Sequence, residues 1–120
     1  MTACERGSVV LVPFPFTDLS AVKRRPALVV SNDHYNAVTG DVIIAQITSR
    51  VNSPPRPGDH RLERWQEAGL PLPSVVRVRM TTVHSSLLVR TLGRMPDDEM
   101  RSIDENLASV LGLFPSSQGK

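Results

Sequence analysis

The chain has 120 residues, a formal net charge of +2 and a single cysteine, Cys4. This length predicts one domain over residues 1–120, large enough to bury a core without disulfide or metal staples. A lone cysteine excludes a disulfide framework and a cysteine-based zinc site, and it favours a reducing compartment. No apolar run approaches the roughly 18 residues that a membrane span needs, and no apolar signal core is present. We therefore expect a soluble, cytoplasmic protein.

The charge is unevenly distributed along the chain. Residues 96–111 carry five acids and one arginine, whereas residues 1–95 carry twelve cations and seven acids. A basic body with an acidic C-terminal element fits a polyanionic partner. It also fits an arginine-rich protein with a solvated surface, and composition alone slightly favours this second interpretation.

The segment Arg25–Ser31 has a clear strand pattern with a cation at its start. Pro26 lacks an N–H group and fits the first position of a strand. The four apolar residues after it suit a strand that is covered on both faces. The proline pushes Arg25 toward an extended backbone, and a planar guanidinium held there is suited to gripping a phosphate.

The other strands are predicted from β-branched runs or from apolar–polar alternation between turn residues. They are expected at residues 8–12, 42–49, 60–63, 74–80 and 87–94. Turns are expected at 32–36, 39–41 and 81–86. A proline-rich loop at 52–58 is of a kind that is often functional in small domains. Within 74–80, the alternation places Arg77 and Arg79 on the same side.

The C-terminal segment has the pattern of one amphipathic helix. Pro96 suits the first helical position, and the acids at 97–99 oppose the N-terminal dipole. Apolar residues from Met100 to Leu111 recur at three- and four-residue spacing, and Gly112 with Pro115 provides a stop signal. The chain is thus predicted to be mainly β (α+β), with five or six mostly antiparallel strands closed by one helix.

Few residues show a pattern typical of catalysis. The histidines His34, His60 and His84 lack the spacing of a helical metal pair. The motifs typical of nucleotide hydrolysis, hydride transfer, Ser-His-Asp chemistry and CxxC redox exchange do not occur. The remaining candidates for catalysis are Arg25 and two hydroxyl side chains, Thr48 and Ser49.

These groups meet if strands 25–31 and 42–49 are adjacent and antiparallel. Arg25 could then clamp a phosphate and Thr48 could orient it. RNA supplies its own 2′-hydroxyl nucleophile, so such a site would need no metal. The alternative is that Arg25 forms a salt bridge and Thr48 only completes its strand, and the pattern by itself favours that alternative.

The segments 7–18 and 23–31 together resemble the opening of the MazF/PemK-like toxins of bacterial type II toxin–antitoxin pairs. The similarity continues at 47–49, 73–76 and 92–95, and it covers about residues 6–113. It implies an SH3-like, partly open antiparallel barrel with a C-terminal helix, of the CcdB/MazF type and usually a homodimer.

The resemblance also implies an activity. Members are endoribonucleases that use no metal or other cofactor and cleave single-stranded mRNA at specific sequences, which inhibits translation and growth. The 2′-hydroxyl attacks, leaving a 2′,3′-cyclic phosphate and a 5′-hydroxyl.

The resemblance implies two catalytic residues: Arg25, which would donate to the scissile phosphate, and Thr48, which would position it. The residues expected to bind RNA are Lys23, Arg24, Ser49, Phe14, Phe16, Arg79 and Thr82. The loops 13–24 and 50–59 are expected to order around RNA. A cognate antitoxin is expected to lay an extended, acidic and apolar tail over the same groove.

The chain departs from the family pattern after the strand at 74–80. Many members have an arginine and an acidic residue in that turn, where this chain has Thr81 and His84. Two other functions remain open: a CcdB-type, non-enzymatic poison of DNA gyrase, and a catalytically weak homologue that binds antitoxin and nucleic acid. The Arg25-Pro26 motif and the motif at 47–49 favour the nuclease.

Overall fold

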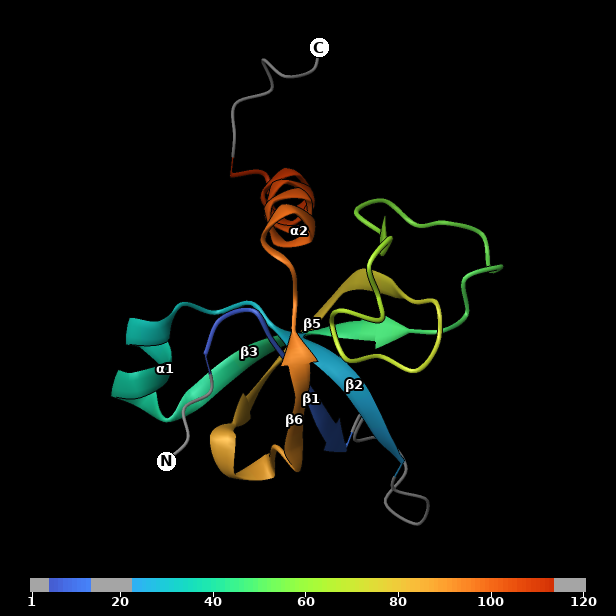
Figure 1. The fold of residues 1–120 in the computed structure, drawn as a ribbon. Coiled ribbons are helices and arrows are strands. Elements are labelled where there is room, and N and C mark those ends of the chain that lie inside the picture. Colours follow the sequence, from blue (N-terminus) through green and yellow to red (C-terminus); the bar gives the residue numbers. More distant parts are fainter. Residues whose placement is uncertain (1–4, 14–22, 114–120) are drawn as a thin grey trace.

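The computed structural model describes residues 5–13 and 23–113, and these residues form one curled antiparallel sheet with two helices. The strands are β1 (Ser8–Pro13), β2 (Arg24–Val29), β3 (Asp41–Thr48), β4 (His60–Arg61), β5 (Val75–His84) and β6 (Arg90–Arg94). Their order in the sheet is β4-β5-β3-β2-β1-β6. Figure 1 shows helix α2 (Asp97–Leu111) standing over one face. The predicted mainly β architecture with a C-terminal helix is confirmed.

The sheet has a core on each face. One core, which we call the helix-side core, joins Leu28 and Ile47 to Ile103 of α2. The other, the opposite core, gathers Val10, Ala27, Val29 and Ile44 with their neighbours on the other face of the sheet. Ala27, Leu28 and Val29 are fully buried, which confirms that this strand is covered on both faces. The larger of these side chains, Leu28 and Val29, each contribute about 1.5–3 kcal/mol by leaving water.

The turn signal at 39–41 marks the place where the chain passes into β3, but the turn expected at 32–36 is wrong, because Asp33–Thr39 forms the short helix α1. The side chain of Asn32 caps its start by accepting a hydrogen bond from the Tyr35 N–H at 2.7 Å. Gly40 ends it in the left-handed conformation, with φ 77°, which glycine adopts without strain. The segment has almost no apolar periodicity, so only its caps could have revealed the helix.

The turn expected at 81–86 is also displaced. Strand β5 continues through Thr81, Thr82 and Val83, which pair with Ile44, Ile43 and Val42 of β3. The turn is instead a 3₁₀ turn, η1 (Ser85–Leu87), and β6 begins at Arg90. β-Branched residues favour the pleated strand, so these threonines extend it. Helix α2 likewise begins one residue late, at Asp97, with Pro96 as its N-cap.

No helix of the described residues is long and apolar enough to cross a membrane.

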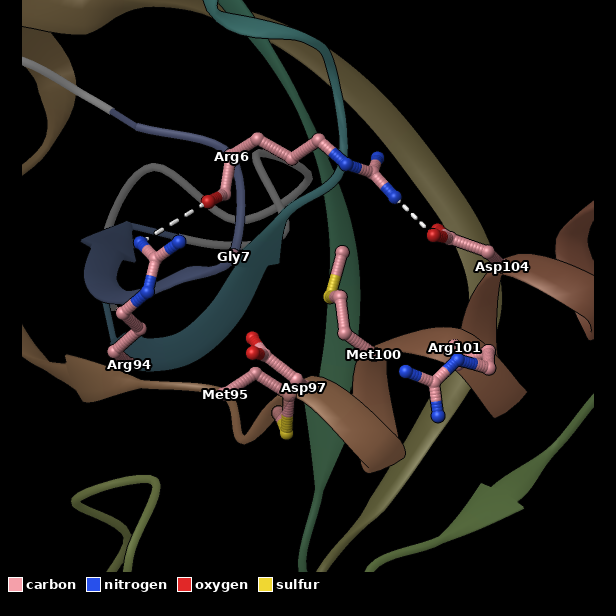
Figure 2. A pocket seen from close by; sticks show the side chains of 8 residues that line it. All are labelled: Arg6, Gly7, Arg94, Met95, Asp97, Met100, Arg101 and Asp104. Carbon is pink, nitrogen blue, oxygen red and sulfur yellow. Dashed lines mark hydrogen bonds and ion pairs between the residues drawn. The ribbon is translucent and has the colours of Figure 1, made fainter.

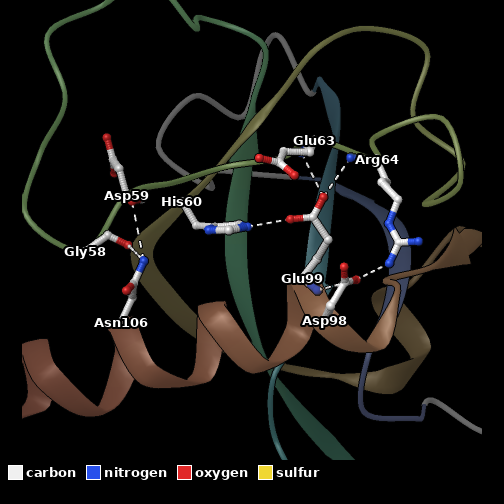
Figure 3. A network of polar contacts seen from close by, with 8 residues as sticks. All are labelled: Gly58, Asp59, His60, Glu63, Arg64, Asp98, Glu99 and Asn106. Carbon is white, nitrogen blue, oxygen red and sulfur yellow. Dashed lines mark hydrogen bonds and ion pairs between the residues drawn. The ribbon is translucent and has the colours of Figure 1, made fainter.

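A buried carboxylate fixes the start of α2 against the segment that contains β4 (Figure 3). Glu99 is only 4% exposed. Its Oε1 lies 2.6 Å from His60 Nε2, and its Oε2 accepts the backbone N–H groups of Glu63 and Arg64 at 2.7 Å each. Burial would raise the pKa of Glu99, but these hydrogen bonds outweigh it and hold the pKa below its ordinary value. Both oxygens of the carboxylate thereby help to hold 60–64 in place.

Glu99→Gln is expected to destabilise the fold at neutral pH by about 1–3 kcal/mol, because hydrogen bonds to a charged acceptor are lost. A lowered pKa in the folded state stabilises the protein above the unfolded pKa, and this contribution disappears as the pH falls. Urea unfolding should therefore show the wild type losing stability below about pH 4.3, and the variant losing less. The exposed Glu105→Gln on the same helix is the control. A variant with the wild-type pH slope would contradict this account.

Candidate active site

The pairing of β2 with β3 decides where the predicted catalytic residues lie. Ala27 pairs with Gln46, Leu28 with Ala45 and Val29 with Ile44. The same register, continued past Pro26, brings Arg25 opposite Thr48. Directly opposed residues of an antiparallel pair share a face, with Cβ atoms about 4.5–5.5 Å apart. The expectation that these two strands are adjacent and antiparallel is confirmed, whereas the catalytic roles stay predictions.

Arg25 is a half-buried cation at the start of β2. Within residues 5–13 and 23–113, no ion pair or hydrogen bond engages its guanidinium. The salt bridge that was the alternative interpretation is therefore not formed with any described residue. A guanidinium that is always charged and only partly solvated is a strong site for an anion.

Thr48 is the last residue of β3 and is half-buried. Its Oγ1 accepts a hydrogen bond from the Arg50 N–H at 3.1 Å. This bond completes the strand end, as the alternative interpretation expected. It also orients the hydroxyl, whose own O–H is left to donate. Arg25 and Thr48 therefore present donors on the same face, which suits an oxyanion such as a phosphate.

The remaining predicted residues fall into three groups. Lys23 and Arg24 are exposed beside Arg25, and Ser49 is exposed directly after Thr48, so the structure brings these three to the same rim. Phe14 and Phe16 lie outside the described residues.

Arg79 and Thr82 are not brought to this rim. Arg79 lies exposed in a bulge of β5, where the register with β3 shifts between Ala45 and Gln46. Thr82 pairs with Ile43. Five residues of β3, or about 16 Å, separate that position from Thr48, and the odd spacing turns its side chain to the other face.

A cavity of about 280 Å³ adjoins Thr48 on the side away from Arg25. Its floor includes Val75, which pairs with both Thr48 of β3 and Arg61 of β4. Arg25, Thr48, Val75 and Arg61 thus form one row across four neighbouring strands. The lining residues come from the loop after β3 and from β4 and β5: Arg50, Val51, Ser53, Pro55, Asp59, Arg61, Val75 and Arg77.

One wall of this cavity is an ion pair. Arg77 donates through Nε to Asp59 Oδ1 at 3.1 Å and through Nη2 to Oδ2 at 3.0 Å. Burial would raise the pKa of Asp59, but the Arg77 hydrogen bonds and the Arg56 N–H lower it. The pKa of Arg77 is raised in turn by Asp59. This pair is locked and neutral, so Arg50 and Arg61 give the cavity its positive charge.

These cavity residues were missed in the sequence because they are far apart along the chain. The alternation at 74–80 marked both Arg77 and Arg79, but it could not tell which one is buried against a carboxylate. Arg50 and Arg61 stand on either side of the proline-rich loop, and only the β4–β5 pairing brings them together. Among the residues with described positions, no three His, Cys, Asp or Glu side chains are placed to share a metal ion.

A second hollow, of about 350 Å³, lies between the N-terminal segment, β6 and α2 (Figure 2). Its charges are largely engaged with one another. Arg6 pairs with Asp104, and Arg94 donates to the carbonyl oxygen of Arg6 at 3.3 Å. Arg101 and Asp97 complete a mixed lining. A hollow that balances cations with acids is a weaker site for a polyanion than the cavity beside Thr48.

Comparison with known proteins gives consistent matches. Residues 5–111 match the family of PemK-like, MazF-like toxins of type II toxin–antitoxin systems. Endoribonuclease MazF6 of Mycobacterium tuberculosis is 38% identical over 93 residues, which are 76% of this chain and 81% of that protein.

Two solved structures show the same fold over nearly the whole chain. An endoribonuclease in complex with its cognate antitoxin, from a mycobacterial species, is 26% identical with a TM-score of 0.73, covering 96% of this chain and 100% of that one. MazF from Deinococcus radiodurans is 29% identical with a TM-score of 0.73, covering 93% and 99%. Sequence and fold therefore agree, and this chain belongs to the PemK-like, MazF-like toxins of type II toxin–antitoxin systems.

Proposed function

We propose that this chain acts in the cytoplasm, as a single domain, as a metal-independent endoribonuclease that cleaves single-stranded mRNA at specific sequences. The observation that carries the proposal is the β2–β3 register. Continued past Pro26, it puts Arg25, which has no partner among the described residues, opposite Thr48. Membership of the toxin family and the endoribonuclease names of its relatives support it. Cleavage of mRNA would stop translation and hence growth.

The reaction is a transfer within the RNA. The 2′-hydroxyl attacks the adjacent phosphorus and loses its proton, and the bond from phosphorus to the 5′-oxygen breaks. Arg25 donates N–H groups to the phosphate oxygens, and Thr48 donates its O–H. These donors stabilise the negative charge that builds up in the transition state. The 5′-oxygen takes up a proton, so the products are a 2′,3′-cyclic phosphate and a 5′-hydroxyl.

The same rim is proposed to bind the partners. Lys23 and Arg24 extend the positive charge from Arg25 and would track the RNA backbone. A cognate antitoxin would cover this rim with an extended, acidic and apolar tail and so compete with RNA. Similar structures carry their antitoxin, as does MazE–MazF of Deinococcus radiodurans. We further propose that the chain is a homodimer.

Purified protein is expected to cleave RNA in the presence of EDTA, because arginine and hydroxyl donors replace a metal at the phosphate. Mapping of fragment ends should find 2′,3′-cyclic phosphates at one recurring sequence. Intact RNA together with gyrase-dependent DNA breaks would overturn the proposal and point to the CcdB-type alternative.

Arg25→Ala is expected to lower kcat by roughly 10²–10³, the usual loss when one donor to a developing oxyanion is removed. Arg25→Lys should recover only part of the rate, since an ammonium lacks the planar fork. The exposed Arg94→Ala serves as the control for losing one positive charge. Wild-type turnover by Arg25→Ala would remove Arg25 from the mechanism.

Thr48→Val keeps the shape of the side chain and removes the hydroxyl. We expect cleavage to slow by about ten- to hundredfold, the loss of one hydrogen bond to a charged group, whereas Thr48→Ser should stay near the wild type. Thermal unfolding measured alongside separates the two roles of Thr48. If the valine variant is less stable but cleaves at the wild-type rate below its melting temperature, the hydroxyl acts only on the Arg50 N–H.

A further inference from the structure

We infer that the cavity beside Thr48 is a nucleobase pocket, and that it selects uracil and guanine, which carry a carbonyl oxygen at O4 or O6, over cytosine and adenine, which carry an amino group at that position. The inference rests on the proposed function and deepens it, because it states which bases the RNA site prefers. Four features of the cavity carry it: its place, its lining, its charge and its rigidity.

The place fits a nucleotide next to the scissile phosphate. Val75 on the cavity floor pairs directly with Thr48, and neighbouring strands lie about 4.7–4.9 Å apart. A phosphate held between Arg25 and Thr48 would therefore put an adjoining base over Val75. Arg61 stands one strand further on, where its exposed guanidinium can meet the next part of the backbone.

The lining fits a flat, mostly apolar ring. Val51, Pro55 and Val75 supply apolar surface, and Ser53 stands exposed at the rim. The volume of about 280 Å³ is near the lower end of small-ligand pockets, which hold about 300–1,000 Å³. Single-stranded RNA is commonly recognised by bases that leave the stack and insert into protein pockets.

The charge decides which base edge is accepted. Both carboxylate oxygens of Asp59 are engaged, by Arg77 and by the Arg56 N–H. Arg77 uses two of its five N–H donors on Asp59, so three remain. In the described part of the chain, neither Arg50 nor Arg61 forms an ion pair.

The cavity therefore offers many donors and few free acceptors. Guanine O6 and uracil O4 are acceptors that match it, whereas at the same positions the N6 amino group of adenine and the N4 amino group of cytosine would set donor against donor. A good pairing of this kind discriminates by about 1–3 kcal/mol, or roughly five- to 150-fold.

The N–H donors of Arg77 are held in place before any base binds, because the segment that carries Asp59 is itself fixed. Asn106 of α2 donates to the carbonyl oxygens of Gly58 and Asp59 at 3.3 and 3.4 Å (Figure 3). Glu99 holds His60 and the backbone after it. The wall that carries Asp59 is thus fixed to the helix, so the geometry at Arg77 costs little to form on binding.

The test is a comparison of two probes that differ at one base edge. Short 2′-O-methyl oligoribonucleotides of uridine alone and of cytidine alone cannot be cleaved, and they offer the pocket the same base in every register. Fluorescence anisotropy with the full chain should give a Kd for the uridine probe at least about fivefold lower. Equal binding of the two probes by the wild type would overturn the inference.

Two variants test whether the preference for uridine arises in the cavity. Asp59→Asn/Arg77→Gln removes both charges of the buried pair together, so neither is left unpaired, and it should abolish the preference for uridine. Ser53→Trp fills the cavity from its exposed rim, and it should abolish the same preference even if the double variant fails to fold. Arg90→Met, an exposed arginine on the opposite edge strand β6, is the control and should keep the wild-type ratio.

The outcomes also separate this inference from the proposed function. A wild type that prefers uridine but cleaves no RNA would contradict the nuclease and leave the pocket standing. RNA cleavage by the wild type, together with a uridine preference that persists in the Ser53→Trp variant, would support the nuclease and overturn the pocket.

Discussion

The pairing of β2 with β3 is the constraint on which both the fold and the site depend. Ala27 and Val29 are buried in the opposite core, and Leu28 between them is buried in the helix-side core. A slip of one residue would exchange these sets and turn every side chain to the wrong face. Core packing on both faces therefore fixes the register. The same register sets Arg25 opposite Thr48, so the geometry of the site is maintained by residues that never touch a substrate.

The molecule uses its charges in two distinct ways. Where an ionised side chain is buried, as for Glu99 or Asp59, each oxygen has a partner, and the pair fixes one segment to another. Other cations have no acidic partner among the described residues, as is the case for Arg25 and for Arg61, which donates only to the Val51 carbonyl oxygen at 3.3 Å. These two lie at the rim of the row that crosses β2, β3, β5 and β4. Burying an unpaired charge is costly, whereas an unpaired charge at a rim remains available to an anion. Ion-paired side chains thus fix the segments that surround the site, whereas cations without an acidic partner remain available to bind an anion.

The sequence was sufficient for most strands, for the final helix and for the adjacency of the strands that carry Arg25 and Thr48, because β-branched runs carry strong local signals. Pro26, expected at the first position of its strand, is instead the third residue of β2 and pairs with Leu11. Helix α1 was missed because its stability comes from caps and from the buried Asn36 rather than from an apolar face. The cavity was missed for a different reason. Asp59, Arg61 and Arg77 are joined by long-range pairing, and one sequence does not show which arginine meets which acid. Arg79 and Thr82 were expected among the RNA-binding residues, but a bulge and the extended β5 place them apart from the rim at Arg25 and Thr48.

The residues that depart from the family pattern have local structural roles, and this bears on where bases are selected. Thr81 pairs with Ile44 in the middle of the sheet, four residues along β3 from Thr48, which is about 13 Å. His84 ends β5, and its Nδ1 accepts the Ser86 N–H at 3.1 Å to cap η1. Both residues thus pair with β3 well away from the end of the strand where Thr48 lies. Under the proposed function, a phosphate at Thr48 would adjoin the cavity that Val75 lines, so differences in cut sequence between this chain and its relatives should follow the cavity residues more closely than this turn.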